Sequence, residues 1–271
     1  MTMKHVVQVR NMILGEGLPK ICVPLTDTTL DSLLKSVRNL SGTPFDFVEW
    51  RADFYEGLCD SDARTRALKC LRDELGDVPV LFTIRTIEEG GQAALSVDEY
   101  EAINRAVIES GLADLVDVEL SKGDEIMRNL CAAAHGSATG SKSDHIAETG
   151  SVPKHAVAII ASKHDFAKTP SETEIVTDLC KMQELGADVA KYAVMPTCER
   201  DVLTLLSATV TMKEKHNDTP VITMSMGRLG AVSRVCGTLS GSAVTFGTAG
   251  NASAPGQLPA DLLKTFLESL A

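Results

Sequence analysis

The sequence has few aromatic residues and no long apolar run. Only 4% of its 271 residues are aromatic, with a single tryptophan. No apolar stretch approaches the roughly 18 residues that a membrane-spanning helix needs. The N-terminus, Met-Thr-Met-Lys-His-Val-Val-Gln-Val-Arg, lacks the apolar core of a signal peptide. These absences predict a soluble, cytoplasmic protein without a membrane partner.

The cysteines lack the spacing of two common kinds of site. They are seven in number, scattered, and never arranged as Cys-x-x-Cys. A disulfide framework is not expected in a chain of this size, and zinc-ligand spacing is missing. We therefore expect no metal site and interpret most of them as small buried side chains. They are Cys22, Cys59, Cys70, Cys131, Cys180, Cys198 and Cys236.

Positive charge is also scarce. The chain has 26 lysines and arginines against 37 aspartates and glutamates, a net charge of −11. A nucleic-acid-binding protein normally carries a basic patch, so a nucleic-acid partner is not expected.

Short apolar runs rich in β-branched residues recur along the chain. Near-continuous runs of this kind are typical of parallel strands that are covered on both faces. The eight runs are Ile21–Leu25, Phe45–Ala52, Val80–Thr86, Leu115–Leu120, Val157–Ser162, Val189–Met195, Val221–Met226 and Ala243–Gly247. Helical patterns lie between them, at Thr29–Leu40, Asp62–Leu75, Ser96–Ser110, Ser171–Leu185, Glu199–Lys215 and Pro259–Leu270.

Strands that alternate with helices eight times predict a single α/β domain over residues 1–271, a (β/α)8 TIM barrel. A doubly wound open sheet is the alternative, but no Gly-x-Gly-x-x-Gly follows a strand. Helix N-caps are expected at Asp31, Asp62, Ser96 and Ser171.

Two segments fall outside this alternation. Val6–Gly17 predicts a small hairpin that caps the barrel floor. Residues 136–151 are rich in Gly, Ser, Thr and charge and have no apolar periodicity, so we expect a flexible insertion loop before the fifth strand, near the floor.

Several strands carry charged residues where only apolar ones belong. Alternate residues of a barrel strand point inward, and active sites gather at the carboxyl ends of the strands. Glu49 and Arg51 share a face, as do Asp117 and Glu119, and Arg85 ends the third strand. Asp117 and Glu119 are better explained as ion-pair partners of the barrel arginines than as metal ligands, because no third ligand joins them.

Lys191 is the most informative of these residues. It lies in mid-strand between apolar neighbours. A lysine held away from water and near other cations populates the neutral amine near neutral pH, and such an amine attacks ketones to form an imine. A structural lysine paired with Glu119 or Glu49 explains its position equally well.

His164 comes at the end of the fifth strand and is a candidate base. Glu89, which follows the third strand, could hold its second ring nitrogen. No role is assigned to His5, His135, His145, His155 or His216.

Arginines gather at the same barrel mouth. Arg51, Arg85 and Arg234 each have an ordinary interpretation as structural ion pairs. Together with Lys191 they predict a site for a carboxylate or phosphate, which guanidinium groups bind bidentately.

This set of residues resembles the type I 3-dehydroquinate dehydratases of the shikimate pathway, which serves aromatic amino acid biosynthesis. The resemblance spans nearly the whole chain. It rests on Val48-Glu49-Trp50-Arg51-Ala52-Asp53, Phe82-Thr83-Ile84-Arg85 with Glu89-Gly90-Gly91, Asp117-Val118-Glu119-Leu120, His164-Asp165-Phe166-Ala167-Lys168-Thr169-Pro170, Lys191-Tyr192-Ala193-Val194-Met195-Pro196, Ser225-Met226-Gly227, Ser233-Arg234, Gly241-Ser242-Ala243-Val244-Thr245-Phe246-Gly247 and Ala252-Ser253-Ala254-Pro255-Gly256-Gln257.

The resemblance implies a lyase that converts 3-dehydroquinate to 3-dehydroshikimate and water, without a cofactor. Lys191 would form the Schiff base, His164 would be the general acid/base, and Glu89 would orient His164. Arg234 would bind the substrate carboxylate. The remaining substrate-binding residues it implies are Glu49, Arg51, Arg85, Ser253, Gln257, Met226 and Phe246, with Ser253 and Gln257 on a covering lid. It also implies a homodimer.

Two departures and two alternatives remain. Pro24 stands at the end of the first strand, where the family often has a small polar residue, and the insertion at 136–151 is longer than the family's. A class I aldolase would use the same lysine but should show a glycine-rich phosphate loop after strands seven and eight. A catalytically silent barrel that senses a small carboxylate would need neither Lys191 nor His164.

Overall fold

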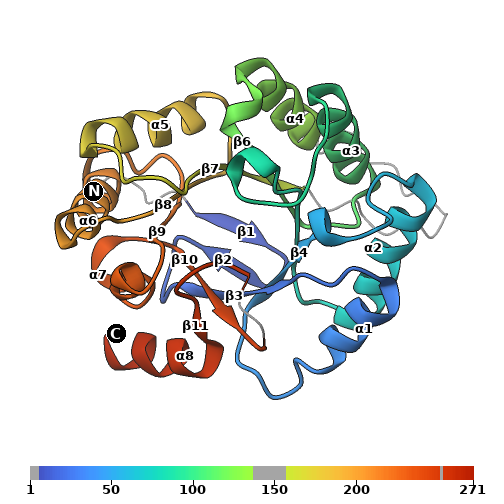
Figure 1. Cartoon of the computed structure of the whole chain (residues 1–271), viewed down its shortest axis with the longest axis horizontal. Coiled ribbons are helices and arrows are strands. Elements are labelled where there is room, and N and C mark those ends of the chain that lie inside the picture. The colour runs from blue at the N-terminus through green and yellow to red at the C-terminus, as the bar shows by residue number, and fades with distance from the viewer. Residues whose placement is uncertain (1–5, 137–156, 251–252) are drawn as a thin grey trace, which may run out of the picture.

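In a computed structural model, residues 6–136, 157–250 and 253–271 are described, and they form a closed ring of parallel strands surrounded by helices (Figure 1). The ring strands are β3 Lys20–Leu25, β4 Phe47–Arg51, β5 Val80–Thr83, β6 Leu115–Glu119, β7 Ala158–Asp165, β8 Val189–Val194, β9 Val221–Ser225 and β10 Val244–Thr248.

Each ring strand pairs in parallel with its neighbours, in the order β10-β3-β4-β5-β6-β7-β8-β9. The ring closes between β9 and β10 through a parallel bridge from Val221 to Ser242 and a 2.8 Å hydrogen bond from the Ala243 N–H to the Val221 carbonyl. A two-residue strand, β11 (Leu258–Pro259), adds to β10 outside the ring. The predicted (β/α)8 barrel is therefore confirmed.

The helices pack on the outside of the ring with their apolar faces inward. In α2, for example, Ala67, Leu68, Leu71 and Leu75 are buried at helical spacing. The helices are α1 Leu30–Arg38, α2 Ser61–Leu75, α3 Val97–Ser110, α4 Asp124–Gly136, α5 Glu172–Glu184, α6 Glu199–Lys215, α7 Gly237–Ser240 and α8 Ala260–Ser269. Short 3-10 turns follow several strands, at η1 Ala52–Phe54, η2 Ile87–Glu89, η3 Leu120–Lys122 and η4 Leu229–Arg234.

An antiparallel hairpin closes the floor of the barrel, as predicted. Strands β1 (Val7–Val9) and β2 (Met12–Leu14) pair with each other and lie across the ring (Figure 1). Val9, Met12 and Leu14 are buried and belong to the same apolar cluster as the inward residues Phe47 and Leu115, which start β4 and β6. The floor is thus apolar, and polar inward residues follow only farther along each strand.

Some strand boundaries differ from the predicted ones, because hydrogen-bonded pairing with the neighbouring strand, and not apolar content, determines where a strand ends. β7 continues past Ser162 through Lys163-His164-Asp165, because His164 pairs with Ala193 and Asp165 with Val194 of β8. β5 stops at Thr83, before Arg85, since the chain turns back and the Arg85 carbonyl accepts from the Ala93 N–H.

Two predicted N-caps were wrong by two residues. Thr29, not Asp31, caps α1, because its side chain accepts from the Ser32 N–H in a capping box. Asp60, not Asp62, caps α2 by accepting from the backbone of Asp62 and Ala63. Ser96 and Ser171 cap α3 and α5 as expected.

The expectation that most cysteines are buried was also wrong. All seven are free, as the absence of a disulfide framework predicted, but only Cys22 and Cys131 are buried, and Cys59 and Cys198 are exposed. Cys198 precedes α6 at its N-cap, a position that faces solvent.

The insertion predicted at 136–151 lies outside the described residues except for Gly136, which ends α4. Across the described ranges, no helix combines the length and the apolar character that crossing a membrane requires.

Candidate active site

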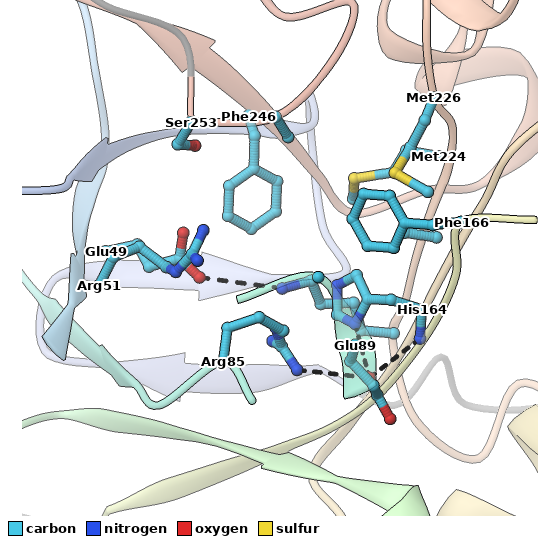
Figure 2. A pocket seen from close by; sticks show the side chains of 14 residues that line it. Glu49, Arg51, Arg85, Glu89, His164, Phe166, Met224, Met226, Phe246 and Ser253 are labelled. Atoms are coloured by element: carbon cyan, nitrogen blue, oxygen red, sulfur yellow. Dashed lines mark hydrogen bonds and ion pairs between the residues drawn. The ribbon is translucent and has the colours of Figure 1, made fainter. Parts of the chain in front are cut away.

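A pocket opens at the carboxyl ends of the barrel strands, above the apolar floor (Figure 2). Its lining residues come from six of the eight ring strands, β4, β5, β7, β8, β9 and β10, or from the loops that follow them. They are Glu49, Arg51, Arg85, Glu89, Gly90, His164, Phe166, Lys191, Ala193, Met224, Met226, Phe246, Ser253 and Ala254.

Lys191 reaches the pocket from the middle of β8 and is 4% exposed. Its Nζ lies 3.1 Å from Asp117 Oδ2, 3.9 Å from Glu49 Oε1 and 4.8 Å from the centre of the Phe246 ring. The charged groups in contact with Nζ are therefore carboxylates, whereas the sequence had suggested other cations. Two nearby carboxylates also stabilise a positive charge that is retained on this nitrogen during a reaction.

A buried ion-pair network lies beneath the lysine. Arg85 donates to Glu119 Oε1 at 2.9 Å, to Asp117 Oδ1 at 2.7 Å and to Ser162 Oγ at 3.1 Å. Asp117 and Glu119 are thus ion-pair partners of a barrel arginine, as predicted. Although burial alone would raise the pKa of Asp117, Arg85 and Lys191 lower it to about 2, so this carboxylate is ionised at neutral pH.

His164 and Glu89 form a pair at the edge of this network. Glu89 Oε2 lies 2.9 Å from His164 Nδ1 and accepts from the His164 backbone N–H at 3.0 Å. Figure 2 shows the Glu89 carboxylate between His164 and Arg85, whose Nη1 is 3.5 Å from the same oxygen. An oxygen that accepts from a backbone N–H and faces a guanidinium carries no proton, so Nδ1 donates to it. This leaves Nε2 unprotonated in the neutral imidazole.

Burial shifts both members of the pair toward their neutral forms. It lowers the pKa of His164 well below its ordinary value, and the nearby cations Arg85, Lys191 and Arg51 lower it further. Burial raises the pKa of Glu89 to about 7, against the opposing effect of Arg85. A neutral imidazole near pH 7 can accept a proton, which is what a general base requires.

Glu49 and Arg51 line the pocket from β4, two residues apart on one face as predicted. Arg51 is held by Asp53 through two bonds, Nε to Oδ1 at 2.7 Å and Nη2 to Oδ2 at 2.8 Å. Glu49 Oε1 accepts from Thr83 Oγ1 at 2.9 Å. Both side chains are therefore fixed before any ligand binds.

Arg234 does not line the pocket directly. It ends η4, is 2% exposed, and donates from Nη2 to the Pro255 carbonyl at 3.0 Å. Burial lowers its pKa to about 10, so it stays charged at neutral pH. Of the three arginines predicted to converge, Arg51 and Arg85 line the pocket, and Arg234 is hydrogen-bonded to the Pro255 carbonyl next to Ala254 of the lining.

The predicted residues Met226, Phe246 and Ser253 line the pocket, and Gln257 does not. Gln257 instead holds Ser253, accepting from its backbone N–H at 2.8 Å and donating to its hydroxyl at 2.9 Å.

The sequence reasoning missed Met224, Phe166 and the contact of Asp117 with Lys191. Met224 lies two residues before Met226, so strand alternation could have indicated it. Phe166 packs against Gly90, where an added Cβ would lie 2.4 Å from its ring, a contact between two loops that no local pattern reveals.

A family model described as type I 3-dehydroquinase matches residues 21–271, the range that holds all of these site residues. The chain belongs to the type I 3-dehydroquinase family. The family and the enzyme class predicted from the sequence, a hydro-lyase, are confirmed.

Relatives of this chain match it over almost its full length. It is 46% identical to the 3-dehydroquinate dehydratase of Bacillus licheniformis over 268 residues, which covers 99% of this chain and 98% of that protein. A crystal structure of the type I enzyme from Clostridium difficile, described with covalent modified comenic acid, superposes with a TM-score of 0.89 at 43% identity, covering 99% of this chain and 98% of that one. The Geobacillus kaustophilus enzyme gives 0.88 at 35% identity, covering 98% and 96%.

In the part of the chain that the structure describes, no group of three or more His, Cys, Asp or Glu residues is arranged to hold a metal ion. Asp117 and Glu119 face Arg85 instead.

Proposed function

We propose that this protein dehydrates 3-dehydroquinate to 3-dehydroshikimate through a Schiff base on Lys191. The amine of Lys191 adds to the C3 ketone and releases water to give an iminium ion. The iminium withdraws electrons from C2, so His164 can remove the C2 proton through Nε2 and leave an enamine. The same histidine then protonates the departing C1 hydroxyl, which leaves as water, and hydrolysis of the iminium frees the product and the lysine.

The observation that carries this proposal is the placement of Lys191 Nζ in one pocket with a neutral, oriented histidine. A ligand-sensing barrel would need neither group. Asp117, 3.1 Å from Nζ, and Glu49, at 3.9 Å, would offset the positive charge of the iminium ion. Glu89 would hold the Nδ1–H tautomer of His164.

Substrate binding is assigned to the other residues of the pocket lining and to two residues that do not line it, Arg234 and Gln257. Arg51 and Glu49 would meet ring hydroxyls, Arg85 would order the carboxylates beneath the ring, and Met226 and Phe246 would form apolar walls. Arg234 would bind the substrate carboxylate. Ser253, held by Gln257, would cover the bound ring and exclude water.

Borohydride reduction tests the Schiff base. With 3-dehydroquinate present, we expect reduction to leave a stable adduct on the peptide that contains Lys191, as measured by peptide mass mapping. Lys191→Met should give no adduct. Lys163→Met, which removes a partly exposed lysine that pairs with Asp178, is the matched control and should still give one. A wild-type protein that forms no adduct on Lys191 would exclude the mechanism.

His164→Ala separates imine formation from proton transfer. This variant should still give the Lys191 adduct while kcat falls by roughly 100-fold to 10,000-fold, the usual contribution of a general acid/base. Normal turnover would make His164 a structural residue.

A homodimer in the cytoplasm is proposed on the family resemblance alone. Sedimentation at several protein concentrations measures the oligomeric state directly.

A further inference from the structure

Ser121 contacts the catalytic pair from outside the pocket. It lies in η3, directly after β6, and its side chain is exposed. Its hydroxyl donates to Glu89 Oε1 at 2.6 Å, whereas Glu89 itself is 3% exposed. A surface hydroxyl thus holds one oxygen of a buried carboxylate whose other oxygen holds His164.

We propose that Ser121 is a positioning residue for His164: by holding Glu89 ionised and fixed in orientation, it keeps the Nδ1–H tautomer that leaves Nε2 free to accept a proton. This inference rests on the proposed function of His164. It assigns a role to a residue that does not itself line the pocket.

The two oxygens of Glu89 have separate donors. Oε2 accepts from the backbone N–H and Nδ1 of His164 and faces Arg85 Nη1 at 3.5 Å. In the described part of the chain, the hydrogen bond to Oε1 comes from Ser121. Short hydrogen bonds to a carboxylate are charge-assisted and fix its plane. Without Ser121, the carboxylate can rotate about its axis and loses its donor on one side.

The ionisation of Glu89 is finely balanced. Burial raises its pKa to about 7, Glu119 and Asp117 raise it, and Arg85 and the Ser121 hydroxyl lower it. The other charged groups nearby do not contact Glu89 directly, and they contact or affect its neighbours instead. They are Lys122, 3.7 Å from Glu119 and 3.4 Å from Glu88, and Lys191 and Arg51, which lower the pKa of His164.

Removal of Ser121 therefore favours protonation of Glu89. A proton on Oε1 neutralises Glu89 and makes Oε2 a weaker acceptor for Nδ1–H, so the Nε2–H tautomer of the neutral imidazole becomes more populated. In that tautomer His164 cannot act as the base. Because the effect depends on protonation of Glu89, it should be large at low pH and small at high pH.

The pH profile of kcat for Ser121→Ala tests this role. We expect the acid limb of the profile to move to higher pH by about one unit, the effect of one hydrogen bond to a charged group. Below the limb, kcat should then be about tenfold lower than in the wild type. Above it, kcat should return to within about twofold of the wild-type value. Ser121→Thr keeps the hydroxyl and should restore the wild-type profile.

Ser207→Ala is the matched control. It removes another exposed serine that donates to a glutamate, Glu172 Oε2 at 2.8 Å, far from the pair in sequence and outside the pocket lining. Its profile should match that of the wild type. A Ser121→Ala profile identical to the wild type, or a loss of equal size at every pH, would contradict the proposal.

Nitrogen NMR of His164 provides a readout that does not depend on turnover. In the wild type well above pH 7, Nδ1 should carry the proton, and as the pH falls the Nε2–H form should increase at a higher pH in Ser121→Ala than in the wild type. An unchanged tautomer ratio overturns the role of Ser121. Failure of the proposed function can be told apart from failure of this role, because it would appear as a missing borohydride adduct on Lys191 in the wild type.

Discussion

Arg234 combines deep burial with unused hydrogen-bonding capacity. Its Nε and Nη1 are buried, and neither has a hydrogen-bond partner in the described part of the chain. A buried charge without partners costs free energy, which an anionic ligand can offset. The substrate of the proposed reaction carries one carboxylate, and a guanidinium binds a carboxylate through two parallel bonds.

Arg234→Ala should therefore weaken substrate binding. Loss of one charged partner typically costs at least about 2 kcal/mol, so we expect KM to rise roughly 30-fold or more. The Lys191 adduct should still form at saturating substrate. Arg228→Ala, an exposed arginine in the same loop, should leave KM close to the wild-type value. An unchanged KM for Arg234→Ala would show that Arg234 does not bind the substrate carboxylate.

At the scale of elements, the carbonyl of Pro255 holds the segment before β11 against the loop that follows β9. Pro255 O accepts from the Gly227 N–H at 3.2 Å and from Arg234 at 3.0 Å. Gly256 makes this possible: its φ is +77°, and a Cβ there would lie 2.2 Å from the Gly227 carbonyl oxygen. Only glycine tolerates both conditions.

Gly256→Ala should displace this segment. Strain of about 1–3 kcal/mol is expected for a side chain in such a position. It should detach Pro255 from Arg234 and raise KM roughly tenfold, with little change in melting temperature because the barrel strands are unaffected. Gly250→Ala is the control, since an added Cβ there meets nothing within 4 Å. Equal steady-state constants for Gly256→Ala and the wild type would show that the segment does not support binding.

At the scale of the whole molecule, the barrel interior contains buried, ion-paired side chains above its apolar floor. Asp117 is fully buried and contacts both Arg85 and Lys191. Its pKa falls from 3.8 to about 2 on folding. A lowered carboxylate pKa contributes stability above the unfolded-state value, and this contribution is lost as the pH falls through that value toward the folded-state value.

Asp117→Asn should destabilise the protein at pH 7, and the difference from the wild type should shrink between about pH 4 and pH 2. The pH-dependent part should be on the order of 2 kcal/mol. Urea unfolding at pH 7, 4 and 3 measures it, with Asp98→Asn as a surface control. A difference in unfolding free energy that stays constant with pH would contradict this account of Asp117.

Local patterns predicted much of the site because alternate side chains of a strand point to the same face. Alternation placed Glu49 with Arg51, and Asp117 with Glu119, on the inward face, and the structure confirms both pairs. The same rule could not state which carboxylate meets Lys191. Asp117 is 74 residues away in sequence, and their contact depends on the offset between β6, β7 and β8.

The eight strands, the floor hairpin and the family were all predictable from local sequence patterns, because apolar runs, turn residues and ordered motifs are local properties. Three contacts follow from the tertiary structure alone: Arg234 donates to Pro255, Gln257 holds Ser253 rather than lining the pocket, and Ser121 donates to Glu89. These contacts join loops from different strands. Their distances follow from strand register and barrel closure, which no local pattern encodes.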